Sequence, residues 1–404
     1  MAPSPDPDAF SLDIGYPVYG AQFASDTKLI VAGGGGEGKN GVANKISVLN
    51  IDPADKKIEI AEEKVLSKDE DSPMSLDITE EGVVAIGVNS SSATIKTGKN
   101  EHLRLFKLES DNRIETQEKT QLFKAEQPDE YQKCTRFSPA ATYLAVASSA
   151  GILHSLSFPS LKPQFRAIDI SDAGADADIQ DVDFSCNEKL LAYTTPKSVT
   201  LLSAGSGEKI AEYYPPPAST FRGVRFASDD TLVLISNHAR RRGASILKLT
   251  LPSDIYLTKQ QSQPPTRTVR GLHAGIKAVT ALDCRESLAC VAGADLSVAV
   301  VRTDTLREVK IVRNAHSFPV TRVVMNSSGT MMASTSVAQS VVVVRIEGAA
   351  AAAASSRLVM VTSTIVSIVV IVIIGVLVQL LVQRQVLGRQ NELAGGKGEE
   401  PRVL

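Results

Sequence analysis

The chain contains no tryptophan and few histidines, and these absences restrict the chemistry that it can perform. Neither a G-x-S-x-G nor a C-x-x-C motif occurs among its 404 residues. The histidines are far apart and form no H-x-x-x-H pair: His102, His154, His238, His273 and His316. Metal-dependent and nucleophilic catalysis need such clusters of ligands and bases. A hydrolase or an oxidoreductase is therefore disfavoured, and we expect no covalent chemistry.

Cysteine is also scarce, and its spacing excludes the common metal sites. Cys134, Cys186, Cys284 and Cys290 are scattered, and three of them lie in or beside apolar, strand-like runs. Such residues are usually buried free thiols. The cysteines thus fit a reducing, cytosolic compartment.

A secretory signal is a third missing feature. The first eight residues, Met-Ala-Pro-Ser-Pro-Asp-Pro-Asp, are proline-rich and acidic, without a basic start or an apolar run. We therefore expect residues 1–347 to be cytosolic. The sequons at Asn89 and Asn326 would carry glycans only if this part of the chain were lumenal.

One long apolar run is present, at residues 358–382, and none of its side chains is charged. At about 1.5 Å per residue, a helix of this length reaches roughly 37 Å and can cross a hydrocarbon core of about 30 Å. The run predicts one transmembrane helix, and the alternative is a buried core helix. It follows an alanine-rich spacer, 348–357, and precedes a short lumenal tail, 383–404. Flanking arginines are nearly balanced and do not set the orientation.

The rest of the chain predicts an all-β fold. No convincing amphipathic helix occurs between positions 16 and 347, and short strand-like runs alternate with clusters of turn residues at fairly even intervals. One unit recurs, which consists of an apolar strand, a small turn and a second strand. Each repeat of the unit is marked by one anchor residue: Phe23, Leu76, Phe137, Phe184, Phe226, Leu282 and Met325. Its later intervals, of 47, 42, 56 and 43 residues, are typical of propeller blades.

We therefore predict a seven-bladed WD40-like β-propeller followed by one C-terminal transmembrane α-helix. Eight blades or a two-sheet sandwich are the alternatives, because no clear Gly-His or Trp-Asp pair marks the repeat. The longest interval contains the polar insertion 259–267. His316, before the last repeat, is interpreted as a residue that hydrogen-bonds across its blade. The acidic run at 69–73 and the basic run at 240–242 are interpreted as solvated loops.

The stretch from Val31 to Lys45 is the most unusual segment, with six glycines between two strand-like runs. Gly33, Gly38 and Lys39 fit most of a phosphate-binding G-x-x-x-x-G-K-[ST] loop. However, Asn40 replaces the hydroxyl residue, and a strand follows instead of the helix that phosphate binding requires. We interpret the segment as a long hairpin excursion that contacts a partner, and the nucleotide-cradling loop is the disfavoured alternative.

Five segments together resemble a known family. They are Gly15–Ala21, Val31–Lys45, Asp71–Pro73, Lys99–Phe106 and Ala315–Phe318. In this order they are similar to the endoplasmic-reticulum guanine-nucleotide exchange factors of the Sec-twelve type, whose animal members are called prolactin regulatory element-binding proteins. The similarity covers roughly residues 13–347, and its most specific part is the glycine-rich motif.

The resemblance implies a seven-bladed propeller that exchanges GDP for GTP on a Sar-family small GTPase at the endoplasmic-reticulum membrane and so starts COPII coat assembly for transport to the Golgi. It implies no nucleic-acid partner. The glycine-rich loop would bind a potassium ion through backbone oxygens and dock on the GTPase. A propeller scaffold without exchange activity is the alternative function.

By this resemblance, individual residues receive expected roles. The exchange-promoting tip is Asn40, Gly41 and Val42. Contacts with the partner are assigned to Gly33, Gly34, Gly35, Gly36, Asn44, Asp71, Ser72 and Pro73. Potassium ligands are assigned to Gly35, Gly36, Gly38 and Asn40. Glu37 and Lys39 depart from the small neutral residues expected in the family, and Lys39 could supply a competing cation.

Overall fold

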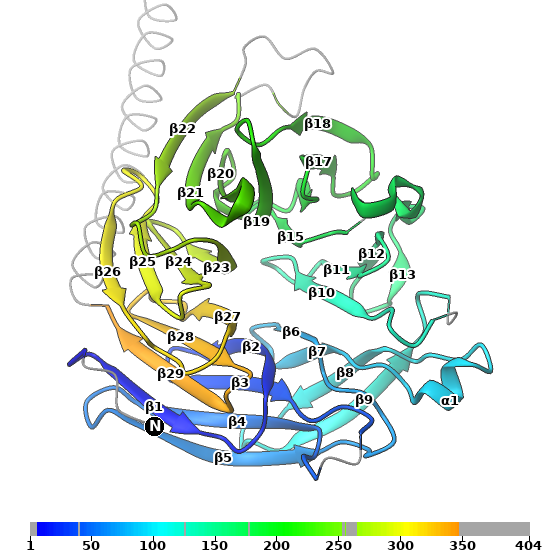
Figure 1. Cartoon of the computed structure of the whole chain (residues 1–404). Coiled ribbons are helices and arrows are strands. Elements are labelled where there is room, and N and C mark those ends of the chain that lie inside the picture. The colour runs from blue at the N-terminus through cyan, green and yellow to red at the C-terminus, as the bar shows by residue number, and fades with distance from the viewer. Residues whose placement is uncertain are drawn as a thin grey trace, which may run out of the picture. The chain divides into compact units, whose positions relative to one another are not determined.

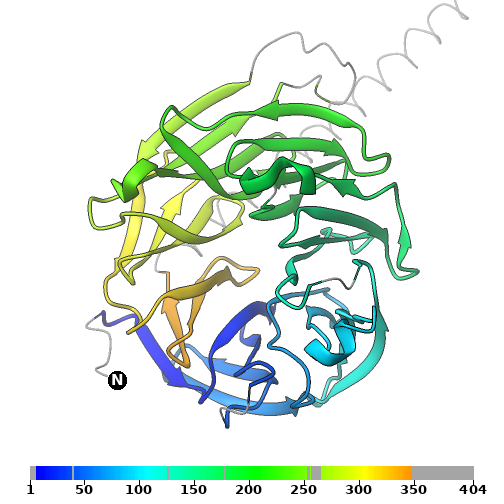
Figure 2. The same cartoon turned by 45° about the vertical axis from the view of Figure 1, so that its right-hand side comes forward.

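The computed structural model describes residues 6–38, 41–124, 127–176, 178–252, 255 and 265–346. This part of the chain forms seven antiparallel sheets, or blades, around a central channel (Figures 1 and 2). It confirms the predicted all-β propeller and its seven blades. The predicted spacer, transmembrane helix and tail lie outside the described residues. Within those residues, no helix has the length and apolar character needed to span a membrane.

Each blade is a meander whose first strand lies nearest the channel. Blade 1 contains β2 (Val18–Ser25), β3 (Lys28–Gly33), β4 (Lys45–Asp52) and β5 (Lys57–Val65). Blade 2 contains β6 (Ser75–Ile78), β7 (Val83–Gly87), β8 (Leu103–Leu108) and β9 (Ile114–Thr120), with helix α1 (Ser92–Ile95) in its β7–β8 loop. Blade 3 contains β10 (Gln132–Phe137), β11 (Tyr143–Ser148), β12 (Ile152–Ser157), β13 (Lys162–Pro163) and β14 (Ile168–Asp169).

The next blades repeat this arrangement. Blade 4 follows a 3₁₀ segment, η1 (Ser171–Asp176), and contains β15 (Asp181–Phe184), β16 (Leu190–Thr194), β17 (Val199–Ser203) and β18 (Lys209–Tyr213). Blade 5 contains β19 (Ser219–Ser228), β20 (Thr231–His238), η2 (Ala239–Arg241), β21 (Ala244–Thr250) and β22 (Thr266–Gly271). Blade 6 contains β23 (Val279–Arg285), β24 (Leu288–Gly293), β25 (Val298–Arg302) and β26 (Glu308–Val312).

The last blade joins the two ends of the domain. Strands β27 (Val320–Met325), β28 (Met331–Ser336) and β29 (Ser340–Arg345) are completed by β1 (Ala9–Asp13), which pairs antiparallel with β29 (Figure 1). Asp8, just before β1, forms ion pairs with Lys310 (2.7 Å) and Arg345 (2.9 Å). The sequence repeat did not predict this closure, because β1 is a single strand outside the repeat.

Apolar side chains pack between neighbouring blades. Ile30 of blade 1, for example, shares a buried cluster with Leu76 of blade 2. The anchor residues lie at or near the ends of the innermost strands, as the repeat predicted. In blades 2 and 6, however, the strands place Ile78 and Cys284 at the anchor position instead of Leu76 and Leu282.

The buried cysteines belong to the same apolar layers. Cys134, Cys284 and Cys290 are buried free thiols, as expected, whereas Cys186 is exposed. Burial raises the pKa of Cys134 to about 11. The buried thiols therefore stay protonated at neutral pH and act as small apolar side chains.

Mostly charged side chains line the channel one residue before each anchor. Around the ring, these positions hold Gln22, Asp77, Arg136, Asp183, Arg225, Asp283 and Val324. Arg136 donates to Asp183 (2.7 Å), and Arg225 donates to Asp283 (3.3 Å). Carboxylates also accept backbone N–H groups of the next blade: Phe137 to Asp77 (2.7 Å), Phe226 to Asp183 (2.8 Å) and Met325 to Asp283 (2.9 Å). Signs alternate from Asp77 to Asp283, so every neighbouring pair attracts.

Two buried histidines connect strands within this framework. His316 Nδ1 lies 2.7 Å from Ser340 Oγ, and its Nε2 lies 2.8 Å from Ser334 Oγ, which confirms its predicted role within its blade. His102 Nε2 accepts the backbone N–H groups of Leu122 and Phe123. Burial lowers the pKa of both histidines to about 4.

The ring predicts that Asp183→Asn destabilises the protein strongly. The change leaves buried Arg136 without its 2.7 Å carboxylate partner, and breaking such a buried pair costs about 3–5 kcal/mol. Denaturant unfolding of the full-length chain would measure this loss. Asp304→Asn is the matched control, because its pair with Arg302 is exposed and its loss should cost under about 1 kcal/mol. Equal losses for both variants would contradict a structural role for the ring.

The histidines predict a loss of stability between about pH 6.5 and pH 4. Both have lowered pKa values in the folded state, so the unfolded chain binds their protons first as the pH falls. Each should remove roughly 1.4 kcal/mol of unfolding free energy per pH unit in this window. Denaturant titrations at pH 7, 6 and 5 would show a shallower pH dependence for His316→Gln. A slope identical to that of the wild type would argue against a neutral buried His316.

Candidate functional site

The glycine-rich connection joins β3 to β4. These strands pair antiparallel, and the paired residues next to the loop are Gly33 and Lys45. A strand, and not a helix, follows it, so the phosphate-binding alternative lacks the helix N-terminus that it requires. Gly33 to Gly38 and Gly41 to Asn44 are described, and Asn40 and Lys39 lie outside the described residues. Of the predicted tip, the structure therefore places Gly41 and Val42.

Two glycines permit the close packing of this loop. Gly34 has φ +149°, and a Cβ there would lie 2.2 Å from Asn44 Oδ1. Gly36 has φ +77°, and a Cβ there would lie 2.8 Å from Asp71 Oδ1. At both positions a side chain would clash with its neighbours, and the positive φ is one that residues other than glycine rarely adopt. The loop can approach its neighbours this closely only because it is rich in glycine.

Asn44 holds the loop to the next connection of the chain. Its Oδ1 accepts the backbone N–H of Gly36 at 3.0 Å, and its Nδ2 donates to the carbonyl oxygen of Glu70 at 2.8 Å. The side chain is only 1% exposed. The Asn44 side chain therefore positions the loop, and its predicted contact with a partner stays a prediction.

The β5–β6 connection supports the loop from the other side. Ser72 Oγ donates to the carbonyl oxygen of Gly34 at 3.1 Å. Ser72 and Pro73 are buried, whereas Asp71 is partly exposed beside Gly36. The predicted residues Gly33–Gly36, Asn44 and Asp71–Pro73 thus come together on one face of the propeller.

Three further residues contribute to this face, and one of them, Glu70, belongs to the acidic run that the sequence led us to interpret as a solvated loop. The Glu70 carboxylate pairs with Arg104 at 2.6 Å and with Lys119 at 3.5 Å. Burial opposes ionisation of Glu70, but the hydrogen bond and charge of Arg104 lower its pKa overall. Arg104 is 2% exposed, so this pair fixes the β5–β6 connection on blade 2. No sequence motif marks such a pair, because its members are far apart in the chain.

Glu37 has a defined place in the structure. Its Oε2 accepts the backbone N–H of Ser92 at 2.8 Å and also the Ser92 hydroxyl at 2.5 Å. The residue that departs from the expected family pattern therefore links the glycine-rich loop to the β7–β8 loop of blade 2. Its charge is directed towards Ser92 by these two contacts.

The two described tip residues differ in exposure. Gly41 has φ +81°, is exposed, and has open space where a Cβ would lie. Val42 is half-buried and packs against the hydrophobic cluster between the first and last blades, which includes Tyr16 and Val341. The end of the loop is therefore held by the core at Val42, between the exposed residues Gly41 and Ala43.

No cluster of three or more His, Cys, Asp or Glu side chains that could hold a metal ion occurs among the described residues. The glycine-rich loop instead offers backbone oxygens. The carbonyl of Gly34 accepts Ser72, that of Gly36 lies 3.4 Å from Asn44 Nδ2, and Asp71 adds a carboxylate nearby. Oxygen-only donors of this kind suit potassium, which proteins bind through backbone carbonyls.

The chain is 27% identical over 340 residues to the guanine nucleotide-exchange factor SEC12 of Candida glabrata, which covers 82% of this chain and 71% of that protein. It is 28% identical over 342 residues to the putative guanine nucleotide-exchange factor SED4 of the same organism, and 26% identical over 348 residues to SED4 of Saccharomyces cerevisiae. No protein-family profile matches the chain.

The chain resembles the Sec12 and Sed4 guanine nucleotide-exchange factors. This confirms the resemblance drawn from the five sequence segments. The match spans 83% of this chain but about a third of either SED4 protein, 32% and 31% of their lengths. The aligned length is comparable to that of the seven-bladed propeller.

The sequons lie inside the Sec12-like propeller. Asn89 is 3% exposed and donates to the carbonyl oxygen of Glu130 at 2.7 Å. Asn326 is fully buried and donates to Thr330 Oγ1 and to the carbonyl of Asp26. The native fold therefore needs both amides free of glycan, and glycosylation is a poor test of topology.

Asn44→Asp should loosen the glycine-rich loop without unfolding the propeller. The change replaces the donor facing the Glu70 carbonyl by an acceptor and buries a charge. We expect amide hydrogen exchange in residues 33–44 and 66–74 to accelerate by about tenfold or more. Asn50→Asp, at an exposed position of β4, the strand that follows Asn44, is the control. Unchanged exchange in Asn44→Asp would show that other contacts hold the loop.

Proposed function

We propose that the protein is a guanine-nucleotide exchange factor for a Sar-family small GTPase at the endoplasmic-reticulum membrane, where GTP loading starts COPII coat assembly for transport to the Golgi. The observation that carries this proposal is the similarity to SEC12 over 82% of the chain. The glycine-rich loop supports it, because its predicted contact residues share one face of the propeller. No nucleic-acid partner is part of the proposal.

Exchange requires that the protein bind the nucleotide-free GTPase more tightly than the loaded one. A preference of about 10⁴ corresponds to roughly 5.5 kcal/mol, more than one loop hydrogen bond provides. A loop and a blade face acting together can supply it. Here the loop base is already ordered by Asn44 and Ser72, so less conformational entropy is lost when a partner binds.

The exposed end of the loop is the proposed contact with the GTPase. Asn40 and Gly41 would reach the nucleotide-binding region, and Val42 would fix their direction from its half-buried position. Asp71 lies beside Gly36 at the loop base and would complete the contact. Glu37 would hold the loop against blade 2 through Ser92.

We propose that potassium orders the same loop. Gly35, Gly36, Gly38 and Asn40 would hold the ion through backbone oxygens. Its charge would offset the mutual repulsion of the converging carbonyl dipoles. We propose membrane attachment through residues 358–382, with the propeller in the cytosol.

The decisive experiment is release of fluorescent GDP from a purified Sar-family GTPase by the full-length chain. We expect acceleration in potassium buffer and a loss of about tenfold or more for the double variant Asn40→Ala, Val42→Ala. That loss corresponds to about 1.4 kcal/mol of transition-state stabilisation. Asn50→Ala, on the same hairpin but away from the loop, is the matched control. Melting curves establish that each variant is folded.

Three other outcomes have distinct meanings. Equal acceleration in sodium and potassium would support exchange and remove potassium from the proposal. Full activity of the folded double variant would move the contact away from the loop tip. No acceleration by the folded wild-type chain would favour the alternative, a membrane-anchored scaffold without exchange activity.

A further inference from the structure

The mouth of the central channel opens on the same face as the glycine-rich loop. Seven residues ring it, one from each blade: Tyr19, Met74, Lys133, Gln180, Arg222, Thr280 and Thr321. Met74 directly follows Pro73 of the β5–β6 connection, which fixes the face. The cavity at this mouth has a volume of about 230 Å³.

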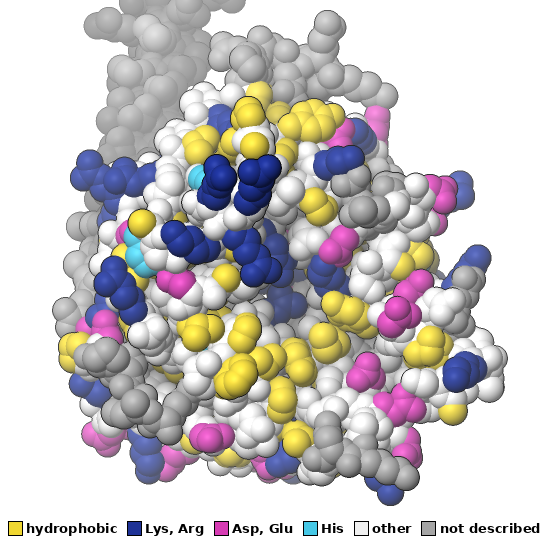
Figure 3. Space-filling model, in the orientation of Figure 1, with side chains coloured by type: hydrophobic (Ala, Val, Ile, Leu, Met, Phe, Trp, Pro, Cys, Tyr) yellow, Lys and Arg dark blue, Asp and Glu magenta, His cyan; other side chains and the backbone are white. Residues whose placement is uncertain are grey.

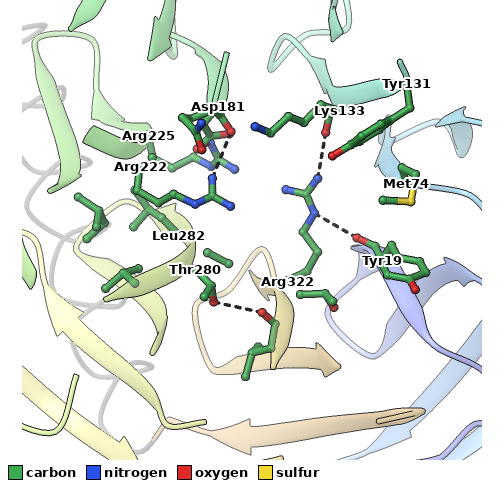
Figure 4. Close-up of a pocket in the computed structure, with 17 residues that line it drawn as sticks. Tyr19, Met74, Tyr131, Lys133, Asp181, Arg222, Arg225, Thr280, Leu282 and Arg322 are labelled. Atoms are coloured by element: carbon green, nitrogen blue, oxygen red, sulfur yellow. Dashed lines mark hydrogen bonds and ion pairs between the residues drawn. The ribbon is translucent and has the colours of Figure 1, made fainter. Parts of the chain in front are cut away.

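β-Bulges shape the mouth. The register of the first two strands shifts at Tyr19, Lys133, Arg222, Thr280 and Thr321, in five of the seven blades. A bulge places two residues opposite one and redirects a side chain. As a result, both the bulged residue and the residue after it border the channel, as Thr321 and Arg322 do. Figure 4 shows Arg322 and the bulged Arg222 beside the cavity.

Positive charge exceeds negative charge at the mouth of the channel. Four cationic side chains, Lys133, Arg222, Arg225 and Arg322, surround the mouth, and two carboxylates, Asp178 and Asp181, neutralise part of their charge. Asp283 lies one layer deeper. Figure 3 shows lysine and arginine side chains gathered around the central opening.

The pairings leave two guanidiniums without a carboxylate among the described residues. Lys133 pairs with Asp178, and Arg225 pairs with Asp181 at 2.6 Å. Arg322 instead donates to the carbonyl oxygens of Tyr19 (3.2 Å) and Lys133 (3.4 Å). Arg222 donates only to the carbonyl of Gln180, at 3.4 Å.

The Arg322 guanidinium is held in an unfavourable state. Burial lowers its pKa, and the nearby charges of Arg225 and Arg222 act in the same direction, whereas the charge of Asp181 opposes them. Unpaired charge in a partly buried cavity is costly, and a bound anion relieves that cost. Guanidinium groups match phosphate oxygens through paired N–H donors.

We propose that the channel mouth is a binding site for a small organic phosphate, held by Arg222, Arg322 and Lys133. At about 230 Å³, the cavity has room for a phosphate group on a compact ring, and the rest of a larger compound would extend out of the mouth. Tyr19 and Tyr131 also border the cavity. The site lies on the same face as the glycine-rich loop. It does not depend on exchange activity, because its test measures binding alone.

Calorimetric titration of the full-length chain at low ionic strength tests the site. Inositol hexakisphosphate is the probe, inorganic phosphate is the minimal anion, and uncharged inositol is the negative control. We expect the hexakisphosphate to bind, with affinity that falls as salt screens the charges. Arg222→Gln and Arg322→Gln should each weaken binding by about tenfold.

Arg302→Gln is the matched control, because Arg302 ends β25, away from the mouth, and already pairs with Asp304 at 2.8 Å. Arg222 has few contacts, so its variant tests the site even if Arg322→Gln fails to fold. Absence of binding, or equal weakening by Arg302→Gln, would overturn the proposal. Sedimentation with vesicles that carry a phosphorylated inositol lipid separates a membrane headgroup from a free compound, and either source supports the site.

Discussion

Electrostatic attraction between neighbouring inner strands in the channel is the interaction on which the rest of the structure depends. Asp77, Arg136, Asp183, Arg225 and Asp283 alternate in sign from blade to blade. The aspartates also bind backbone N–H groups of the next blade, as Asp183 does for Phe226. Each link therefore fixes both distance and register, because a slip by one residue would place the charge on the other face of the strand. Apolar packing between blades supplies most of the burial, and the charges determine how the blades meet.

The candidate site follows from this arrangement. In a propeller, the loops that follow the second and fourth strands of each blade emerge on one face, so the β3–β4 and β5–β6 connections meet although a whole hairpin of chain separates them. Asn44 and Ser72 then join them by hydrogen bonds to backbone carbonyls. The glycine content of the loop has a dual consequence. It permits the close approach of Gly34 and Gly36 at the base, and it leaves Gly41 unhindered near the tip.

The same face combines two unlike surfaces. The glycine-rich loop presents backbone groups and the acidic residue Glu37, and the adjoining β5–β6 connection adds Asp71. The channel mouth presents guanidiniums that lack carboxylate partners among the described residues, at the centre. A protein partner that covers this face would meet both, so an anion bound at the mouth would lie close to the proposed GTPase contact. The bulges that expose these arginines are a local departure from regular strand pairing, and such departures often re-aim side chains at functional positions.

The sequence alone determined the all-β class, the seven repeats, the buried thiols and the role of His316, because each depends on local patterns of apolar and turn residues. It also marked the glycine-rich loop, since that composition has a large entropic cost unless the backbone needs it. Only the tertiary structure decided how β1 closes the ring, that the Asn44 side chain positions the loop, and that Glu37 contacts Ser92. The alternating charges and the basic mouth also became visible only there. These features join residues that are far apart in the chain, and no local pattern encodes which distant side chains the ring brings together.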